Sequence, residues 1–114
     1  MDHIEKLKFL EECVFYGLEN RSNGFDSELI KYFSESEFEI VLDRIENLKI
    51  GVNGIEPWLH GEFYDVMSTE EFNSIATDPK WYRGAFSEFK KQNKELLYAA
   101  SYDVPEEMLR DYKI

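Results

Sequence analysis

Two histidines and one cysteine are the side chains in this sequence best suited to catalysis or metal binding. They are His3, Cys13 and His60, and they lie far apart along the chain. Structural zinc sites draw their Cys and His ligands from closely spaced pairs, and these three residues have no such spacing. A nucleophilic pair of Cys13 and His60 has no supporting local motif. The sequence therefore predicts no metal site and no cysteine-based catalysis.

Other motifs of catalysis or cofactor binding are also missing from the sequence. Residues 51–54 contain two glycines, but no Lys-Ser or Lys-Thr follows them, as a phosphate-binding loop requires. The acidic residues lack the spacing of a calcium loop, and no two of them stand out as an acid–base pair. We expect no cofactor and no enzymatic activity. An enzyme without recognisable motifs remains an alternative.

The acidic residues are concentrated in the middle of the chain. The formal net charge is −11, and residues 35–78 hold eleven of the 24 acids but only two of the 13 bases. Such a surface attracts basic partners and repels phosphate backbones and anionic membranes, although acidity can also serve solubility alone. The basic cluster of Lys90, Lys91 and Lys94 is most simply the solvated face of a helix. We expect a protein partner, with no binding to nucleic acid or membranes.

Cysteine usage and the first residues bear on the compartment. The only cysteine, Cys13, cannot form an internal disulfide and is expected to be a small buried residue on a helix. Residues 1–5 lack the basic stretch and apolar run of a signal peptide. No apolar segment approaches the roughly 20 residues needed to cross a bilayer. These features predict a cytoplasmic protein.

The segment from Gly54 to Asp65 combines aromatic side chains with carboxylates on a backbone stiffened by proline and bent by glycines. Tryptophan and tyrosine are frequent anchors of protein interfaces, and carboxylates complement lysine and arginine on a partner. The alternative is that Trp58, Phe63 and Val66 are core residues of a short hairpin whose acids face water, and for Phe63 we expect the core. Of the aromatics, we expect Tyr64 to be at the surface.

The elements that must position these residues are predicted to be mostly helical. Residues 4–20 have apolar residues at three- and four-residue steps, and residues 26–33 fit a short capped helix. A capping box at 36–39 predicts a helix with Val41, Leu42, Ile45 and Leu48 facing inward, with a strand over 38–42 as the alternative. Residues 49–67 are the least helical part, because glycines and Pro57 interrupt them.

Three more helices are expected in the second half of the chain. Ser68 and Glu71 fit a second capping box, which opens a short helix with Phe72 and Ile75. Asp78 and Pro79 fit the cap and first position of a longer helix. The apolar face of that helix is expected to run from Tyr82 to Ala100. A last short helix follows from 103 to 109.

The expected fold is therefore mainly α, with an α+β arrangement as the alternative. We predict a single compact domain over residues 1–114, helical except for an irregular or short β-hairpin centre around residues 49–67. The sequence leaves the oligomeric state open.

Small size, strong acidity, few cysteines and absent catalytic motifs resemble the immunity proteins of bacterial contact-dependent growth inhibition systems. The most distinctive parts are the segment 54–65 and the run from Phe72 to Asp78-Pro79-Lys80-Trp81-Tyr82. The resemblance implies a tight one-to-one complex with a cognate toxin domain, often a tRNase or DNase. It carries no residue roles. A phage-type inhibitor, a DNA mimic or a regulatory subunit is the alternative.

A nuclease presents a basic cleft to phosphates, so an acidic surface can occupy that cleft in place of substrate. On this hypothesis the partner-binding residues come from the central acidic segment and its aromatics. They are Glu35, Glu37, Glu39, Asp43, Glu46, Glu56, Trp58, Glu62, Tyr64 and Asp65.

Overall fold

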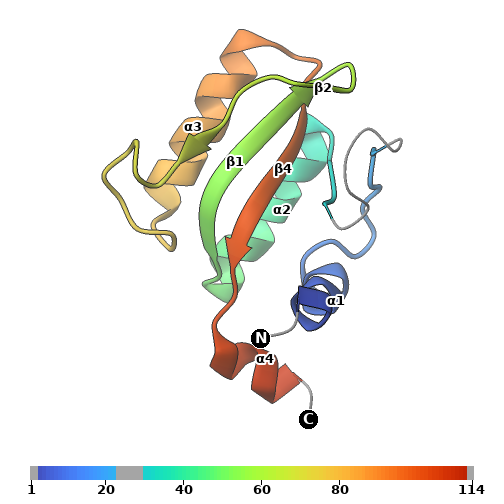
Figure 1. The fold of residues 1–114 in the computed structure, drawn as a ribbon, viewed down its shortest axis with the longest axis vertical. Helices are drawn as coiled ribbons and strands as arrows, with labels where there is room; N and C mark the ends of the chain where they lie inside the picture. Colours follow the sequence, from blue (N-terminus) through green and yellow to red (C-terminus); the bar gives the residue numbers. More distant parts are fainter. Residues whose placement is uncertain (1–2, 23–29, 113–114) are drawn as a thin grey trace.

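The chain folds into a small antiparallel sheet with helices packed on one face (Figure 1). This computed structural model describes residues 3–22 and 30–112. The mainly-α prediction is wrong, because the described part contains four strands as well as four helices and is an α+β fold. The elements are α1 (His3–Cys13), α2 (Glu35–Leu48), β1 (Gly51–Leu59), β2 (Glu62–Phe63), β3 (Met67–Ser68), α3 (Pro79–Gln92), β4 (Leu97–Asp103) and α4 (Glu106–Tyr112).

Strand β1 is the centre of the sheet. Along one edge it pairs with β4 over nearly its whole length, and along the other it pairs with β2 near its end and with β3 near its middle. Pro57 is tolerated within β1 because it lies opposite Tyr98, whose backbone groups bond to Phe33 instead. The Pro57 carbonyl accepts a hydrogen bond from the Tyr64 N–H at 3.0 Å. The centre predicted as irregular or a short β-hairpin therefore contains a nine-residue strand, whose pairing with β4 shifts register between Val52 and Gly54.

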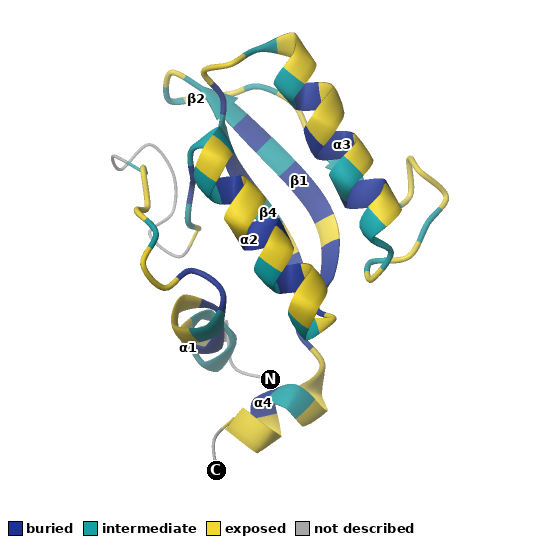
Figure 2. Cartoon of the chain, turned by 180° about the vertical axis from the view of Figure 1, so that it is seen from behind, coloured by how far each residue is buried: buried dark blue, intermediate teal, exposed yellow. Residues whose placement is uncertain are grey.

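Helices α2 and α3 cover one face of the sheet, as Figure 2 shows from behind. Helix α2 buries Phe38, Val41, Leu42 and Ile45, so the predicted helix and its inward face are confirmed and the strand over 38–42 is wrong. Its cap is Ser34, whose hydroxyl accepts from the Glu37 N–H, and not Ser36.

Helix α3 begins as predicted and ends early. Asp78 caps it, and Pro79 occupies its first turn. The helix stops at Gln92, and the residues expected to prolong it form β4. The short helix predicted after Ser68 is absent: Ser68 lies in β3, and turns occupy most of the connection to Asp78.

The N-terminal helix is shorter than expected, and the C-terminal one agrees with its prediction. Helix α1 ends at Cys13, and the chain turns through Gly17 at a positive φ of 76°. Residues 26–29 of the predicted helix over 26–33 lie outside the described part, and Phe33 forms a β-bridge with Tyr98. Helix α4, predicted within 103–109, spans Glu106–Tyr112.

Aromatic rings join the two layers. The rings of Phe38 on α2 and Tyr98 on β4 stack at 5.1 Å, and the Phe86 ring on α3 meets both edge-on at 5.3 and 4.9 Å. All three side chains are at most 2% exposed. This cluster of Phe38, Phe86 and Tyr98 fixes the helices on the sheet.

The hydroxyl of Tyr102 is buried without a hydrogen-bond partner in the described part of the chain. Burial also raises the pKa of this phenol, so it stays protonated. We expect Tyr102→Phe to raise the free energy of unfolding by about 1 kcal/mol, because the substitution removes an unsatisfied polar group and keeps the ring. Urea denaturation measures this change.

Tyr64→Phe is the matched control, because the Tyr64 hydroxyl donates to Gln92 Oε1 at 2.9 Å. We expect this variant to lose about 0.5–1 kcal/mol. Equal losses in both variants would contradict the prediction and would show that the Tyr102 hydroxyl has a partner in solution.

Candidate functional site

The end of the β1–β2 hairpin carries Phe63, which is the most exposed aromatic side chain of the segment 54–65. Leu59 pairs with Glu62 across a two-residue turn in which His60 and Gly61 both have positive φ, at 52° and 80°. This is the backbone of a tight hairpin turn, for which glycine at the second position is well suited. The predicted hairpin is thus present here, and the turn sets Phe63 directly opposite Trp58.

Trp58 and Phe63 lie on the face of the sheet away from α2 and α3. Ile55 is fully buried on the helix side of the sheet. Because side chains alternate along a strand, those of Glu56 and Trp58 both point to the outer face. The rings of Trp58 and Phe63 meet edge-on at 6.2 Å, and the Trp58 indole N–H donates to Glu56 Oε2 at 2.6 Å. Trp58 is half-buried and Phe63 is 55% exposed.

We call Glu56, Trp58, Glu62, Phe63 and Asp65 the hairpin end. Within residues 3–22 and 30–112, none of its three carboxylates forms an ion pair. Glu62 and Asp65 are exposed, and Asp65 bonds only to the next N–H along the chain, that of Val66. No cation of the described residues therefore compensates the negative charge of the hairpin end.

The acids of α2 are arranged differently, because three of them face basic residues of α3. Arg83 bonds to Asp43 Oδ1 at 2.7 Å and to Glu46 Oε1 at 3.1 Å, and Lys90 lies 3.5 Å from Glu39. Burial lowers the pKa of Arg83, but the hydrogen bonds and charges of the two carboxylates outweigh it, and the pKa is raised overall. These acids hold two helices together as well as contributing charge.

The first two acids of α2 differ from the other three, because neither faces a basic side chain of α3. Glu37 Oε1 accepts from the Glu19 N–H at 3.2 Å. Glu35 Oε1 is buried and has no hydrogen-bond partner in the described residues. Burial and, next, the nearby Glu35 charge raise the pKa of the Tyr98 phenol. The Glu35 carboxylate is thus turned toward the core.

The ten predicted contact residues therefore do not share one face. Those of α2 belong to the helical layer seen in Figure 2, whereas Glu56 and Trp58 lie on the opposite face of the sheet. Tyr64, expected at the surface, is half-buried, with its ring 6.5 Å from that of Phe89. Phe63, expected in the core, is the exposed aromatic. The register of β2 against β1 decides which of Phe63 and Tyr64 is exposed, and the sequence did not specify that register.

The residues with catalytic potential are not brought together. Cys13 ends α1 and His60 lies in the β1–β2 turn, and Figure 1 shows these elements toward opposite ends of the molecule. Burial and then Glu12 raise the pKa of the Cys13 thiol, which disfavours the nucleophilic thiolate. No group of three or more His, Cys, Asp or Glu in the described residues could hold a metal ion.

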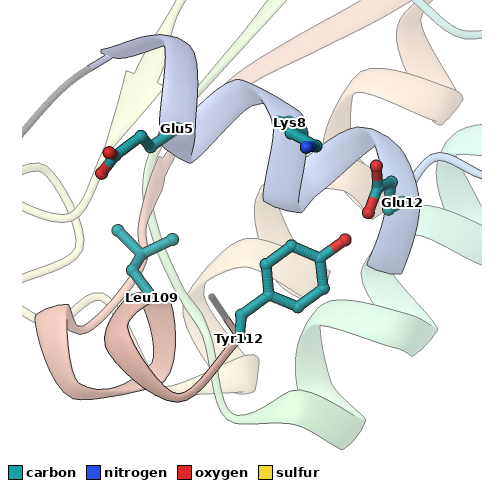
Figure 3. A pocket seen from close by; sticks show the side chains of 5 residues that line it. All are labelled: Glu5, Lys8, Glu12, Leu109 and Tyr112. Carbon is teal, nitrogen blue, oxygen red and sulfur yellow. The ribbon is translucent and has the colours of Figure 1, made fainter. Parts of the chain in front are cut away.

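A shallow pocket of about 500 Å³ lies between α1 and α4. Figure 3 shows that Glu5, Lys8 and Glu12 line it from α1, and Leu109 and Tyr112 from α4. Its charged groups of both signs lie along one helix face at exposed or half-buried positions. This is the pattern of a solvent-exposed surface between two packed helices, and we assign no function to it.

Comparison of the chain with models of protein families, with curated proteins and with solved structures gave no match. In the part of the chain that the structure describes, no helix has the length and apolar character to span a membrane.

Proposed function

We propose that this chain is a binding protein whose partner is a basic protein domain, and that the hairpin end is its principal contact. The observation that carries the proposal is the exposed Phe63 beside Trp58, on a hairpin that also carries three carboxylates that no cation of the described residues neutralises. Elsewhere three acids of α2, Glu39, Asp43 and Glu46, are matched by Lys90 and Arg83. An aromatic anchor next to unmatched charge suits a partner that supplies lysine or arginine.

The partner class that fits best is a nuclease toxin domain, as the resemblance to immunity proteins implies. A nuclease must keep a basic cleft for phosphates, and the carboxylates of Glu56, Glu62 and Asp65 would occupy that cleft in their place. The net charge of −11 steers association with such a partner and speeds its capture. On this proposal the chain acts by occlusion and carries out no reaction.

The geometry of the hairpin matches this use. Glu62 lies opposite Leu59 and so faces the helix side, whereas Trp58 and Phe63 face the other side. A cleft that grips the end of a hairpin contacts both of its faces, so it would meet the aromatic pair on one side and a carboxylate on the other. Burying the exposed half of the Phe63 ring would contribute about 1 kcal/mol to binding.

A double charge reversal tests the proposal. The product of the adjacent upstream reading frame, as a catalytically inactive variant, is titrated with wild-type chain and with Glu62→Lys/Asp65→Lys. We expect the double variant to bind at least about tenfold more weakly and with a shallower dependence on salt, because it loses charge at the contact. Glu70→Lys/Glu71→Lys is the matched control, since both residues are exposed and outside the hairpin end.

The control should stay within about threefold of wild type, because a distant charge acts only through the overall field. Equal weakening by both double variants would assign the effect to net charge and overturn the hairpin end as the contact. If the neighbouring product formed no complex with the wild-type chain, the immunity function itself would be refuted.

A further inference from the structure

The chain from β2 to β3 forms one edge of the sheet. It pairs with β1 at both of its ends, over residues 62–63 and 67–68, and with no other strand of the described chain. In Figure 1 it runs along the side of β1 opposite β4. Glu62, Phe63, Asp65 and Val66 are all exposed, so the side chains along this edge are open to a partner.

The hydrogen bonds to β1 show which backbone groups of this edge point outward. The Tyr64 N–H donates to the Pro57 carbonyl at 3.0 Å, so the backbone groups of Tyr64 point toward β1. Backbone groups of successive residues in a strand point to alternate edges. The N–H and C=O of Phe63 and of Asp65, on either side of Tyr64, therefore point away from β1.

The hairpin turn supports the same assignment for Phe63. A two-residue turn makes its flanking residues, Leu59 and Glu62, a hydrogen-bonded pair, and such pairs alternate with non-hydrogen-bonded ones along antiparallel strands. Phe63 is the next residue, so it exchanges no backbone hydrogen bond with β1. Within residues 3–22 and 30–112, no group bonds to the backbone of Phe63 or Asp65. Their N–H and C=O groups are thus left for a further strand.

Beyond Asp65 this edge is interrupted by a bulge. The stretch from Phe63 to Met67 is one residue longer than the part of β1 that it faces. The Val66 N–H is occupied by the Asp65 carboxylate at 2.8 Å, and the Ser68 carbonyl accepts from the next turn of the chain. The open part of the edge is therefore short and lies in the hairpin end.

We propose that the basic partner binds the hairpin end by adding an extended strand along Phe63 and Asp65. This inference rests on the proposed function and specifies how the partner is held. The outward backbone groups supply main-chain hydrogen bonds, and the side chains beside them supply specificity. Glu62 and Asp65 form no ion pair with any described residue. The segment that fits therefore carries an apolar side chain opposite Phe63 and lysine or arginine opposite Glu62 and Asp65.

A second copy of this chain does not fit the same edge. Two copies paired along this edge would bring the exposed Glu62 and Asp65 of each close to those of the other. Like charges on opposing strands destabilise their pairing, and charged residues and bulges are common means by which edge strands avoid self-association. The charges that exclude a second copy attract a strand of opposite charge.

Two variants at one position separate the backbone contribution from that of the side chain. Asp65→Ala and Asp65→Pro both remove the carboxylate, but only proline also removes the outward N–H, and proline is tolerated at edge strands and bulges. The product of the adjacent upstream reading frame, as a catalytically inactive variant, is titrated with each of them and with the wild-type chain. Circular dichroism confirms that each variant is folded.

We expect Asp65→Pro to bind about tenfold more weakly than Asp65→Ala, because an acceptor of the added strand loses its donor. Amide hydrogen exchange at Phe63 and Asp65 should be fast in the free chain and slow in the complex. The Tyr64 amide is the internal control, since it already donates to Pro57 and should exchange slowly in both states.

Equal affinity of folded Asp65→Pro and Asp65→Ala would reject the added strand and leave the proposed function standing. Exchange at Phe63 and Asp65 that does not slow in the complex would have the same meaning. Slow exchange at both amides in the free chain would show that the edge is already paired. If the wild-type chain formed no complex, the proposed function would fail and the added strand with it. If Asp65→Pro does not fold, the exchange measurement decides.

Discussion

Phe38→Ala is expected to lower the free energy of unfolding by about 3–5 kcal/mol, the cost of deleting a fully buried phenylalanine. The Phe38 ring is 0% exposed and contacts Tyr98 and Phe86 at 5.1 and 5.3 Å. Its removal leaves a cavity where α2, α3 and β4 meet. Since a domain of this size has a total stability of about 5–15 kcal/mol, this loss removes between about a fifth and all of it.

Urea denaturation followed by circular dichroism measures the loss, and Phe63→Ala is the matched control. Phe63 undergoes the same chemical change, but its ring is 55% exposed and lies at the end of the hairpin. The control should lose less than about 1 kcal/mol. Comparable losses in the two variants would mean that Phe63 is buried in solution, which would also remove the aromatic anchor from the proposed contact.

The sequence predicted the helices best where local chemistry determines them. Asp78 and Pro79 set the start of α3 by capping and by a fixed φ, and both act within one turn. The inward face of α2 followed from the spacing of Val41, Leu42 and Ile45. Such signals need no knowledge of the rest of the chain.

The strands were missed because long-range pairing determines them. Leu96 and Ala100 continue the apolar spacing of α3, so residues 97–103 resembled the end of a helix until their pairing with β1 was known. The glycines and Pro57 within β1 were misleading for the same reason, because only the pairing of the strand shows that it accommodates them. Pro57 is compatible with a central strand only because Tyr98 bonds to Phe33 and not to Pro57.

The same limit applies to the candidate site. The sequence located the acidic segment and the aromatics within it, but not the register that exposes Phe63 and turns Tyr64 toward Phe89. It also could not show that Arg83 lies against Asp43 across two helices, forty residues apart. Charges that look alike in sequence differ in the fold, because some are paired within the chain. The three carboxylates of the hairpin end are among those that form no ion pair with the described residues.

Gly51→Ala is expected to lower the free energy of unfolding by about 1–3 kcal/mol, because a methyl group has no room at the start of β1. A Cβ atom at this position would lie 2.7 Å from the Cβ of Ala76 and 3.1 Å from the Cβ of Asp103. Neither neighbour can rotate away, since a Cβ atom is fixed by its own backbone. The Ala76 segment is in turn tied to β1 by the bond from the Val52 N–H.

Gly84→Ala makes the identical change at a position where nothing lies within 4 Å of the added methyl group. Gly84 is exposed in the interior of α3, where alanine is favoured over glycine by about 0.5–1 kcal/mol, so this variant should gain stability. Thermal denaturation of both variants and of wild type in the same buffer shows whether each substitution raises or lowers the stability. If Gly51→Ala were as stable as wild type, the segment around Ala76 would not pack against β1 in solution, and the tight connection between β3 and α3 would have to be rejected.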